Sequence, residues 1–334
     1  MPEIEYVEDR MESEELLERL CPPVRNWFKD KFPDFTEPQK VAIPRILNGE
    51  HLLLCSPTGS GKTLTAFLTI IDDLVRRSLD GSLPDAVQCV YISPIKALAN
   101  DIEKNLLGPL GEIKERYLPS RAKEIKVGLR TGDTPQSERE KMLRKPPHIL
   151  ITTPESMGLG LASKRFRPIL DQMKWFIIDE MHSLVPTKRG THLSLSMALM
   201  DSVVSSDVQR IGISATMEPL DAVAEFLVAS DSRESDIDPQ KVAIAKISGD
   251  RELDLDIILP TPRFSSIPVK EILDHNVDRI KELAEAHTTT LVFVNTRNMT
   301  ETVVQRLKIA GMEGVEGHHG SMDKAIRLDV ESKL

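Results

Sequence analysis

The sequence has few cysteines, few aromatic residues and no long apolar run. Of its 334 residues only three are cysteines, and none stands in a C-x-x-C pair. Three cysteines cannot form a disulfide framework, so we expect a reducing, cytoplasmic compartment. No run of roughly 18 apolar residues is present, and the N-terminus lacks the basic and apolar regions of a leader. We therefore expect neither a membrane-spanning helix nor a secretory signal.

Excess positive charge is also absent, because the net charge is −9 at pH 7. A bulk electrostatic attraction to nucleic acid is therefore not expected. The charge is uneven, however. Residues 1–20 hold eight acidic residues against two arginines, whereas residues 114–145 hold ten Lys and Arg against five Asp and Glu. The second segment is either a local basic face or a solvated, salt-bridged surface, and charge alone favours the second interpretation.

Apolar runs of strand length alternate with helix-length amphipathic stretches along most of the chain. This alternation predicts an α/β fold, a parallel sheet covered by helices on both faces. The predicted strands are 51–55, 87–93, 125–130, 148–152, 174–179 and 208–213. The predicted helices are 62–77, 96–107, 135–144, 154–172, 190–205 and 219–229, and Thr36 to Gln39 read as the capped start of an earlier one.

A polar, acidic stretch near 230–240 predicts a linker between two domains, a number that the length also suggests. We expect an acidic N-terminal segment at 1–24, a first α/β domain at 25–229 and a smaller domain at 241–334. In the smaller domain the predicted strands are 241–247, 253–259, 290–295 and 313–317, and the predicted helices are 268–287, 298–311 and 323–333.

A glycine-rich loop follows the first buried strand and opens a helix. The loop consists of Ser56, Pro57, Thr58, Gly59, Ser60, Gly61, Lys62 and Thr63. In this setting backbone amides surround phosphate oxygens, Lys62 reaches the β- and γ-phosphates of ATP, and the Thr63 hydroxyl binds Mg²⁺. The loop departs from the usual G-x-x-x-x-G-K-[ST] pattern in having serine at its first position. An ordinary glycine-rich turn is the alternative, which the flanking strand and helix disfavour.

Asp179 and Glu180 directly follow the apolar run WFII. An acid at the carboxyl end of a strand in the same sheet as the phosphate loop can hold Mg²⁺ through water, and a second carboxylate can orient the attacking water. We therefore assign Asp179 to the metal and Glu180 as the candidate base. A helix N-cap is the ordinary explanation of a lone acidic pair, but the position after a hydrophobic strand argues against it.

Lys62-Thr63, the sequence DEMH at 179–182 and the sequence SAT at 214–216 resemble motifs I, II and III of superfamily 2 DEAD/DExH-type helicases. Longer phrases resemble the large helicase-related (Lhr) family of ATP-dependent DNA helicases. These are SPIKALAND at 93–101, RTGDTP at 130–135, TTPES at 152–156, KRGTHL at 188–193, LVFVNTR at 291–297 and HHGS at 318–321. The resemblance covers about residues 25–334 and implies two RecA-like domains with ATP between them and single-stranded nucleic acid across them.

The resemblance also implies roles for residues around the ATP site. Gln39 is similar to the adenine-reading glutamine of the family, although it also completes a capping box with Thr36. His182 would link the ATP site to motif III, which we prefer to a metal-ligand role. Ser214 and Thr216 would couple the nucleotide state to domain movement.

Other matched positions imply contacts to the nucleic-acid backbone. Hydroxyls, amides and a lysine on loops give sequence-blind contact with phosphate. The positions are Pro94, Lys96, Thr131, Gly132, Thr153 and Pro154, followed late in the chain by Asn295, Thr296, Arg297 and His319. The expected partner is single-stranded or tailed DNA, while RNA or a hybrid stays open. The pair His318-His319 has no Cys or His partner at zinc-ligand spacing.

No Q-x-x-G-R-x-G-R pattern of the family's motif VI occurs in the 334 residues. An arginine finger is worth roughly 10³–10⁵ in rate. We therefore expect a chain truncated before motifs V and VI, which binds ATP and single strands but hydrolyses poorly unless a second polypeptide supplies those motifs. The alternative is a non-catalytic ATP- and nucleic-acid-binding module. An unrelated P-loop kinase or transporter is disfavoured by SAT and PIKALAND.

Overall fold

A computed structural model describes most of the chain. The described residues are 2–94, 102–205, 207–215, 217–228, 241–247, 254–259 and 269–323, with Ile326, Asp329, Val330 and Lys333. The chain divides into two compact units, Met1–Asp250 and Arg251–Leu334.

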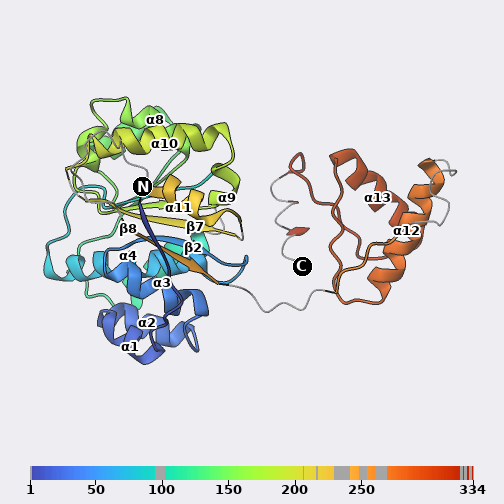
Figure 1. The fold of residues 1–334 in the computed structure, drawn as a ribbon, viewed down its shortest axis with the longest axis horizontal. Helices are drawn as coiled ribbons and strands as arrows, with labels where there is room; N and C mark the ends of the chain where they lie inside the picture. The colour runs from blue at the N-terminus through green and yellow to red at the C-terminus, as the bar shows by residue number, and fades with distance from the viewer. Residues whose placement is uncertain are drawn as a thin grey trace. The chain divides into compact units, whose positions relative to one another are not determined.

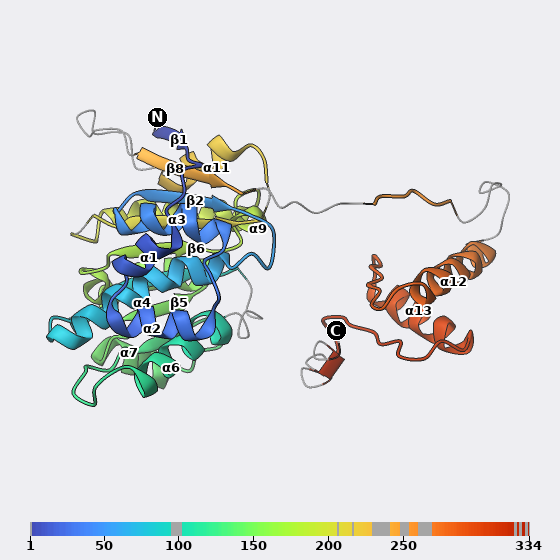
Figure 2. The ribbon, with the colours of Figure 1, turned by 90° about the horizontal axis from the view of Figure 1, so that it is seen from below.

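The first unit is built on one parallel sheet of eight strands (Figures 1 and 2). Their order across the sheet is β1-β8-β2-β7-β6-β3-β5-β4, and every pairing is parallel. The bounds are β1 Glu3–Tyr6, β2 His51–Cys55, β3 Cys89–Ile92, β4 Val127–Arg130, β5 Ile149–Thr152, β6 Trp175–Ile178, β7 Gln209–Ser214 and β8 Lys241–Lys246. The predicted α/β class and the six predicted strands of this sheet are confirmed, with ends shifted by one or two residues.

Helices cover both faces of this sheet (Figure 1). One face carries α1 (Ser13–Arg19), α2 (Pro22–Lys31), α3 (Glu37–Leu47), α4 (Lys62–Asp80), the π-helix η1 (Glu103–Leu107) and α6 (Gly108–Arg116). The other carries α8 (Pro154–Leu161), the 3₁₀ turn η2 (Arg167–Leu170), α9 (Met181–Leu184), α10 (Lys188–Asp201) and α11 (Leu220–Val228). Helix α7 (Gln136–Arg144) has no fully buried residue.

The alternation of side chains along the strands produces two separate cores. In β2, Leu52 and Leu54 pack on the α1–α4 side, whereas Leu53 and Cys55 pack on the α8–α11 side. Successive strand residues point to opposite faces, so a strand buried on both sides must be apolar throughout. This requirement explains the run HLLLC and places the end of β2, where the phosphate loop begins, in the middle of the sheet.

Two segments lie elsewhere than predicted. Residues 241–247 were expected to open the second domain, but β8 pairs with β2 and is an interior strand of the first sheet. Residues 1–24 were expected to stand apart, but β1 pairs with β8, and Leu16 of α1 is fully buried. The acidic side chains of this segment face solvent while its apolar ones join the core, which the charge pattern alone does not reveal.

The second unit contains α12 (Val269–Glu285) and α13 (Arg297–Ile309), which confirms two predicted helices. Its small core consists of Val277, Val303 and Leu307. The strands predicted at 253–259, 290–295 and 313–317 are wrong, because the described residues of this unit, which exclude 253, form no strand. Apolar residues at these positions meet the side-chain requirement of a strand, but a strand also needs a hydrogen-bonding neighbour. The helix predicted at 323–333 lies mostly outside the described residues.

None of the helices in the described part of the chain is long and apolar enough to span a membrane. Cys21, Cys55 and Cys89 are free and buried. Burial raises the pKa of the Cys55 thiol to about 11 and that of the Cys21 thiol to about 12. These thiols are therefore protonated at neutral pH and serve as small apolar groups in the core.

Candidate nucleotide site and nucleic-acid interface

The phosphate loop lies between β2 and α4, at the carboxyl edge of the sheet. Gly59 and Gly61 have φ angles of 79° and 86°, in the left-handed region that favours glycine. The loop is tied to the sheet by the Ser56 amide, which donates to the Ser214 carbonyl at 3.2 Å. The Ser56 hydroxyl lies 2.6 Å from that of Ser60. Serine at the first position therefore adds a hydrogen bond across the loop, which glycine cannot make.

The Lys62 ammonium is folded back onto the loop. It donates to the carbonyls of Ser56 and Pro57 at 2.6 and 2.7 Å. Burial lowers the pKa of Lys62, while the nearby carboxylates of Glu180 and Asp179 act in the opposite direction. The charged amine thus lies among carbonyl groups at the point where the sequence predicts phosphate, and it faces the two acids predicted from the motif DEMH.

Gln39 and Thr36 form the predicted capping box at the start of α3. The Gln39 side-chain oxygen accepts from the Thr36 amide at 2.8 Å, and the Thr36 hydroxyl donates to the Ser60 carbonyl at 3.1 Å. The second bond joins the start of α3 to the phosphate loop. The amide oxygen of Gln39 is occupied by the cap, and its nitrogen lies on the side of Gly61. The structure thus confirms the cap, and the adenine contact stays a prediction.

Asp179 and Glu180 follow β6 directly. Asp179 is almost fully buried and accepts hydrogen bonds from the Tyr91 hydroxyl and from the Glu180 amide, the latter at 2.8 Å. Glu180 has a φ of 54° and is the only non-glycine residue with positive φ among the described residues. Such a backbone conformation costs on the order of 1–3 kcal/mol and is concentrated at functional sites. With this backbone conformation the Asp179 carboxylate is buried, while the neighbouring Glu180 carboxylate is half-exposed.

His182 connects Glu180 to the end of β7. Its Nδ1 accepts from the Ala215 amide at 3.2 Å, and its Nε2 lies 3.1 Å from the Glu180 carboxylate. A backbone amide only donates, so the proton of the neutral ring is on Nε2 and points at Glu180. Ser214 adds contacts from its hydroxyl to the amide and ring of His182 at 3.2 and 3.3 Å. His182 and Ser214, two of the three residues predicted for coupling, are therefore in direct contact.

A pocket of about 660 Å³ is lined by the phosphate loop, the start of α3 and the two acids that follow β6. Its lining includes Thr36, Gln39, residues 58–64 of the loop and α4, Asp179 and Glu180. Mg²⁺ prefers oxygen ligands, is usually held by one or two carboxylates and keeps several waters. The Thr63 hydroxyl and the Asp179 carboxylate line the same pocket and fit this donor set. No cluster of three His, Cys, Asp or Glu that could hold a metal by itself occurs in the described ranges.

The predicted nucleic-acid residues of the first unit lie at the ends of β3, β4 and β5. Pro94 follows β3 and is buried. Thr131 and Gly132 form a turn directly after β4 and are partly or fully exposed. Thr153 caps α8 by accepting from the Ser156 amide at 3.3 Å and is only 8% exposed, and Pro154 begins that helix. The turn after β4 is therefore the most accessible of these positions.

The late motifs meet within the second unit. Thr296 caps α13 by accepting from the Met299 amide at 3.2 Å, and Arg297 donates to the Ser321 hydroxyl. His319 lies 2.7 Å from the Glu301 carboxylate. Asn295, just before the cap, is exposed. Two phrases more than 20 residues apart in the sequence, LVFVNTR and HHGS, are thus joined by a side-chain contact.

Two predicted site residues, Lys96 and Thr216, lie outside the described residues. Sequence reasoning in turn missed several groups of the nucleotide pocket. The Tyr91 hydroxyl in β3 donates a hydrogen bond to Asp179. In the sequence Tyr91 cannot be told apart from an ordinary aromatic residue of a buried strand. Lys104 and Asn105 of η1, with Trp27 and Glu112, also line the pocket. The π-helix is the one local signal here, since such turns are frequent at functional sites, but it is not visible in the sequence.

Comparison with known proteins agrees with this geometry. The family model for DEAD/DEAH box helicases matches residues 36–224, from the capping threonine of α3 into α11. The chain belongs to the DEAD/DEAH box helicase family. The helicase motifs I, II and III recognised in the sequence lie inside the matched region, so the predicted superfamily is confirmed.

Within this helicase family the chain is similar to Lhr proteins, as predicted. It is 44% identical over its whole length to the ATP-dependent helicase Lhr-Core of Methanocaldococcus jannaschii, and 46% identical over 94% of its length to that of Methanothermobacter thermautotrophicus. The solved structure of Mycobacterium smegmatis helicase Lhr bound to ssDNA and AMP-PNP matches 95% of the chain with a TM-score of 0.74 and 38% identity. The DEAD-box helicase Mss116 shares the fold at a TM-score of 0.70 and 17% identity.

The matched relatives are much longer than this helicase chain. It spans 39% and 37% of the two archaeal Lhr-Core proteins and 40% of the mycobacterial chain. The RecA-like fold of the ATP-binding unit is established by these comparisons, and the activity of a whole Lhr protein is a separate matter.

Proposed function

We propose that this chain is the ATP-binding and nucleic-acid-binding core of an Lhr-like ATP-dependent helicase that acts on single-stranded or tailed DNA. One observation carries the proposal: Lys62, Thr63, Asp179 and Glu180 line a single pocket of about 660 Å³. Family membership and the similarity to an Lhr structure bound to ssDNA and AMP-PNP support it.

The chain's own residues divide the work of ATP hydrolysis. Lys62 leaves the carbonyls of Ser56 and Pro57 and binds the β- and γ-phosphates, because a phosphate oxygen is a stronger acceptor than a carbonyl. Thr63 and Asp179 would hold Mg²⁺, the acid through water, and the bound ion would neutralise charge on the phosphates. Glu180 orients the attacking water and accepts its proton.

Coupling to nucleic acid runs through the contact between Glu180, His182 and the end of β7. A change in the charge or position of Glu180 alters its 3.1 Å contact with His182 Nε2, and the ring is anchored by Ala215 and Ser214. Thr216 follows these residues directly and shares their proposed coupling role. Arg297 and its neighbours in the second unit provide further proposed contacts to the strand.

Catalysis by these 334 residues is proposed to be slow, because they contain no motif VI arginines to meet the γ-phosphate. A second polypeptide supplying motifs V and VI would restore the rate. The same absence favours the second candidate function, a module that binds ATP and nucleic acid without translocating.

Phosphate release from ATP tests the proposal, with Glu180→Gln as the matched variant. We expect the chain to bind an ATP analogue with Mg²⁺, to hydrolyse ATP slowly and to gain little from single-stranded DNA. Glu180→Gln keeps the size and the binding and loses the hydrolysis that remains. A rate in Glu180→Gln equal to that of the wild type would remove Glu180 from the mechanism. Strong DNA-stimulated hydrolysis by the wild type would show that another arginine completes the site.

A further inference from the structure

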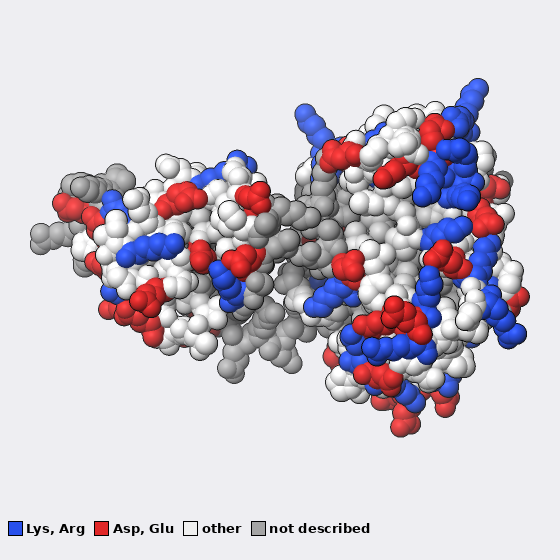
Figure 3. All heavy atoms as spheres, turned by 180° about the vertical axis from the view of Figure 1, so that it is seen from behind, with Lys and Arg blue, Asp and Glu red and all other residues white. Residues whose placement is uncertain are grey.

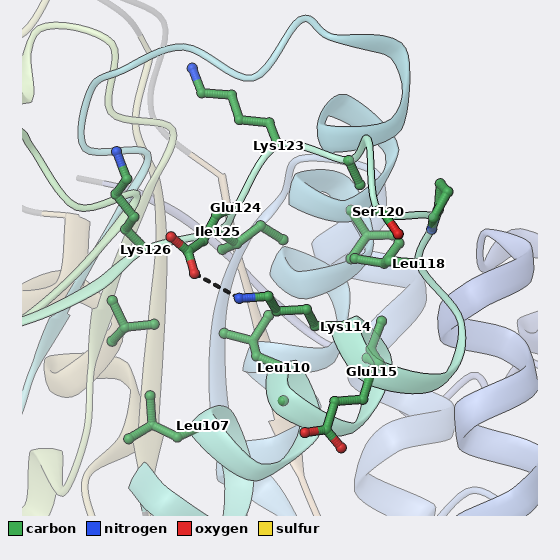
Figure 4. Close-up of a pocket in the computed structure, with 16 residues that line it drawn as sticks. Leu107, Leu110, Lys114, Glu115, Leu118, Ser120, Lys123, Glu124, Ile125 and Lys126 are labelled. Carbon is green, nitrogen blue, oxygen red and sulfur yellow. Dashed lines mark hydrogen bonds and ion pairs between the residues drawn. The ribbon is translucent and has the colours of Figure 1, made fainter.

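The basic segment 114–145 divides into two parts with different surroundings. Figure 3 shows lysine and arginine side chains gathered on one face of the first unit, with acidic side chains among them. In the first part, Lys114 pairs with Glu124 at 2.7 Å (Figure 4), and Lys123 pairs with Asp85 at 3.0 Å. These lysines border an apolar hollow of about 630 Å³. Their charges are compensated by neighbouring carboxylates, which fits the solvated surface favoured from charge alone.

The second part is organised around Arg139 of α7. Its Nε donates to the Thr134 carbonyl at 2.9 Å, and its Nη2 donates to the carbonyls of Thr131 and Gly132, each at 2.9 Å. One guanidinium thus gathers three carbonyls of the turn that follows β4. Arginine can do this because its donors lie in a fixed planar fork, whereas a lysine ammonium is a single point of charge.

The same turn is held from inside by its threonines. The Thr131 amide donates to the Thr134 hydroxyl at 2.8 Å, which in turn donates to the Leu129 carbonyl at 3.2 Å. The Thr131 hydroxyl accepts from the Asp133 amide at 3.3 Å and keeps its own proton to donate. The Gly132 amide has no hydrogen-bond acceptor within the described residues. The turn therefore retains a hydroxyl and an amide as donors while its carbonyls face Arg139.

Two guanidinium groups, those of Arg130 and Arg139, lie beside this turn, which itself contains one acid, Asp133. Neither Arg130 nor Arg139 makes an ion pair with a carboxylate among the residues that the structure describes, and the nearby Glu140 is occupied by Arg165 at 2.8 Å. Arg130 lies over the Phe166 ring, 4.7 Å from its centre. Burial lowers the pKa of Arg130, and the charge of Arg139 lowers it further. Two guanidinium groups are thus close enough to repel each other, and an anion bound at the turn would relieve this repulsion.

We propose that Arg139 is a positioning residue for the nucleic-acid backbone: it draws the carbonyls of the Thr131–Thr134 turn away from the strand, so that the Thr131 hydroxyl and the Gly132 amide donate to one phosphate. Arg130 supplies charge at the same place. The ligand is a backbone phosphate of a single strand, bound without regard to base, because the groups that would bind it are two donors and a cation that contact phosphate. This inference rests on the proposed function, in which Thr131 and Gly132 contact nucleic acid.

Arg139→Lys tests the proposal, with Arg144→Lys as the matched control. Both variants keep the charge on α7, but among the described residues the hydrogen bonding of Arg144 is limited to the Glu140 carbonyl, at 3.4 Å. Binding of a fluorescent single-stranded oligonucleotide to the full chain is measured at low salt. We expect Arg139→Lys to weaken binding about tenfold, the effect of losing charge-assisted hydrogen bonds that order the turn. Arg144→Lys should stay within about twofold of the wild type.

Two further readouts separate positioning from a general structural effect. The affinity for a fluorescent ATP analogue should be unchanged in Arg139→Lys. In a Thr131→Ala background, Arg139→Lys should cost markedly less than it does in the wild type, because the two residues act on the same phosphate. The inference would be overturned if Thr131→Ala and Arg139→Lys reduced the affinity for the single strand by independent factors that multiply. It would also be overturned if Arg139→Lys lost ATP affinity in parallel, or if Arg139→Lys and Arg144→Lys lost strand affinity equally.

The two levels of proposal fail in different ways. If the wild-type chain binds no single strand at low salt, the proposed function falls and this inference falls with it. If the wild type binds and Arg139→Lys binds equally well, the positioning role of Arg139 is wrong while the proposed function stands.

Discussion

At the residue scale, the site depends on a few charged groups that the fold holds with hydrogen-bond partners. Lys62 and Asp179 illustrate this. The ammonium of Lys62 lies between two carbonyls, and the buried carboxylate of Asp179 is held by a tyrosine hydroxyl and a backbone amide. Asp179 is oriented before a ligand arrives, which reduces the ordering that binding requires, whereas Lys62 exchanges its two carbonyl acceptors for phosphate oxygens.

Lys62→Ala should weaken binding of a fluorescent ATP analogue at least tenfold. The substitution removes a charged donor to phosphate, and hydrogen bonds of this kind contribute about 1.5–3 kcal/mol each. Lys174→Ala is the control, since Lys174 is an exposed lysine of the same unit whose nearest carboxylate, on Asp73, lies 4.0 Å away. Equal affinities for wild type and Lys62→Ala, measured by fluorescence titration with Mg²⁺, would remove the phosphate site from the account.

A buried histidine makes the stability of the first unit depend on pH. His148 is fully buried, its Nδ1 accepts from the Lys126 amide at 2.8 Å, and burial lowers its pKa to about 4. The unfolded value is about 6.5. Because the folded pKa is depressed, stabilisation is complete above about pH 6.5 and is lost as the pH falls towards 4, where the unfolded chain binds the extra proton.

We expect His148 to lower the free energy of unfolding by up to about 1.4 kcal/mol per pH unit across this window. His148→Asn keeps an acceptor near the position of Nδ1 and should flatten the dependence. His192→Asn, at an exposed site, should leave it unchanged. Urea unfolding followed by the fluorescence of Trp27 and Trp175 reports on the first unit, which holds both tryptophans. Identical slopes for wild type and His148→Asn would contradict the assignment.

At the scale of elements, α10 packs closely against α8 and α9, the helices that follow β5 and β6. Gly190 allows the start of α10 to approach α9, since a Cβ there would lie 2.4 Å from the Leu184 carbonyl and 2.9 Å from that of Val185. Backbone cannot move aside as a flexible side chain can. The Arg189–Glu155 ion pair, at 2.6 Å, joins α10 to α8 across the same region.

Gly190→Ala should therefore lower the free energy of unfolding by about 1–3 kcal/mol, the usual cost of overpacking. Gly111→Ala in α6 is the matched control, because a Cβ there meets nothing within 4 Å. In a helix this change should be neutral or stabilise by about 0.4–1 kcal/mol. The measurement is chemical unfolding of both variants beside the wild type. If Gly190→Ala were as stable as Gly111→Ala, α9 and α10 would have to move apart at no cost, which would contradict this expectation.

The elements that the sequence predicts well are those whose side-chain pattern is local. Strands such as β2 and β6 are apolar throughout, because both of their faces are buried. The edge strand β1 has the polar sequence EIEY and was missed, since one of its sides has no neighbouring strand. The placement of β8 was missed for another reason. Its partner β2 lies about 190 residues earlier, and the sequence of β8 does not indicate which strand it pairs with.

The candidate site follows the same rule. Lys62, Thr63, Asp179 and Glu180 were predicted because they stand in short motifs next to strands, and the structure brings them to one pocket. Tyr91 and Arg139 were not predicted. Each acts through a contact with a residue or turn that its own local sequence does not specify, either across strands or from a helix back to a loop. Contacts of this kind are set by packing and leave no local pattern.

At the scale of the whole molecule, the charges that sum to −9 are unevenly distributed along the chain. Acidic residues dominate the first 20 positions, while the turn after β4 carries guanidinium groups without carboxylate partners in the described part of the chain. A chain that is acidic overall can therefore bind a polyanion at one place. Such binding depends on few contacts, so it should be weak and sensitive to salt.

This chain combines a nucleotide pocket with a proposed sequence-blind phosphate interface. The most direct test is a titration of two single-stranded oligonucleotides of different sequence with the wild-type chain, with Mg²⁺ and AMP-PNP present, over a series of salt concentrations. We predict equal affinities for the two sequences and a linear fall of log K with log salt, of about 0.7 per phosphate contacted. An affinity that ignores salt, or no binding even at the lowest salt concentration, would contradict the account.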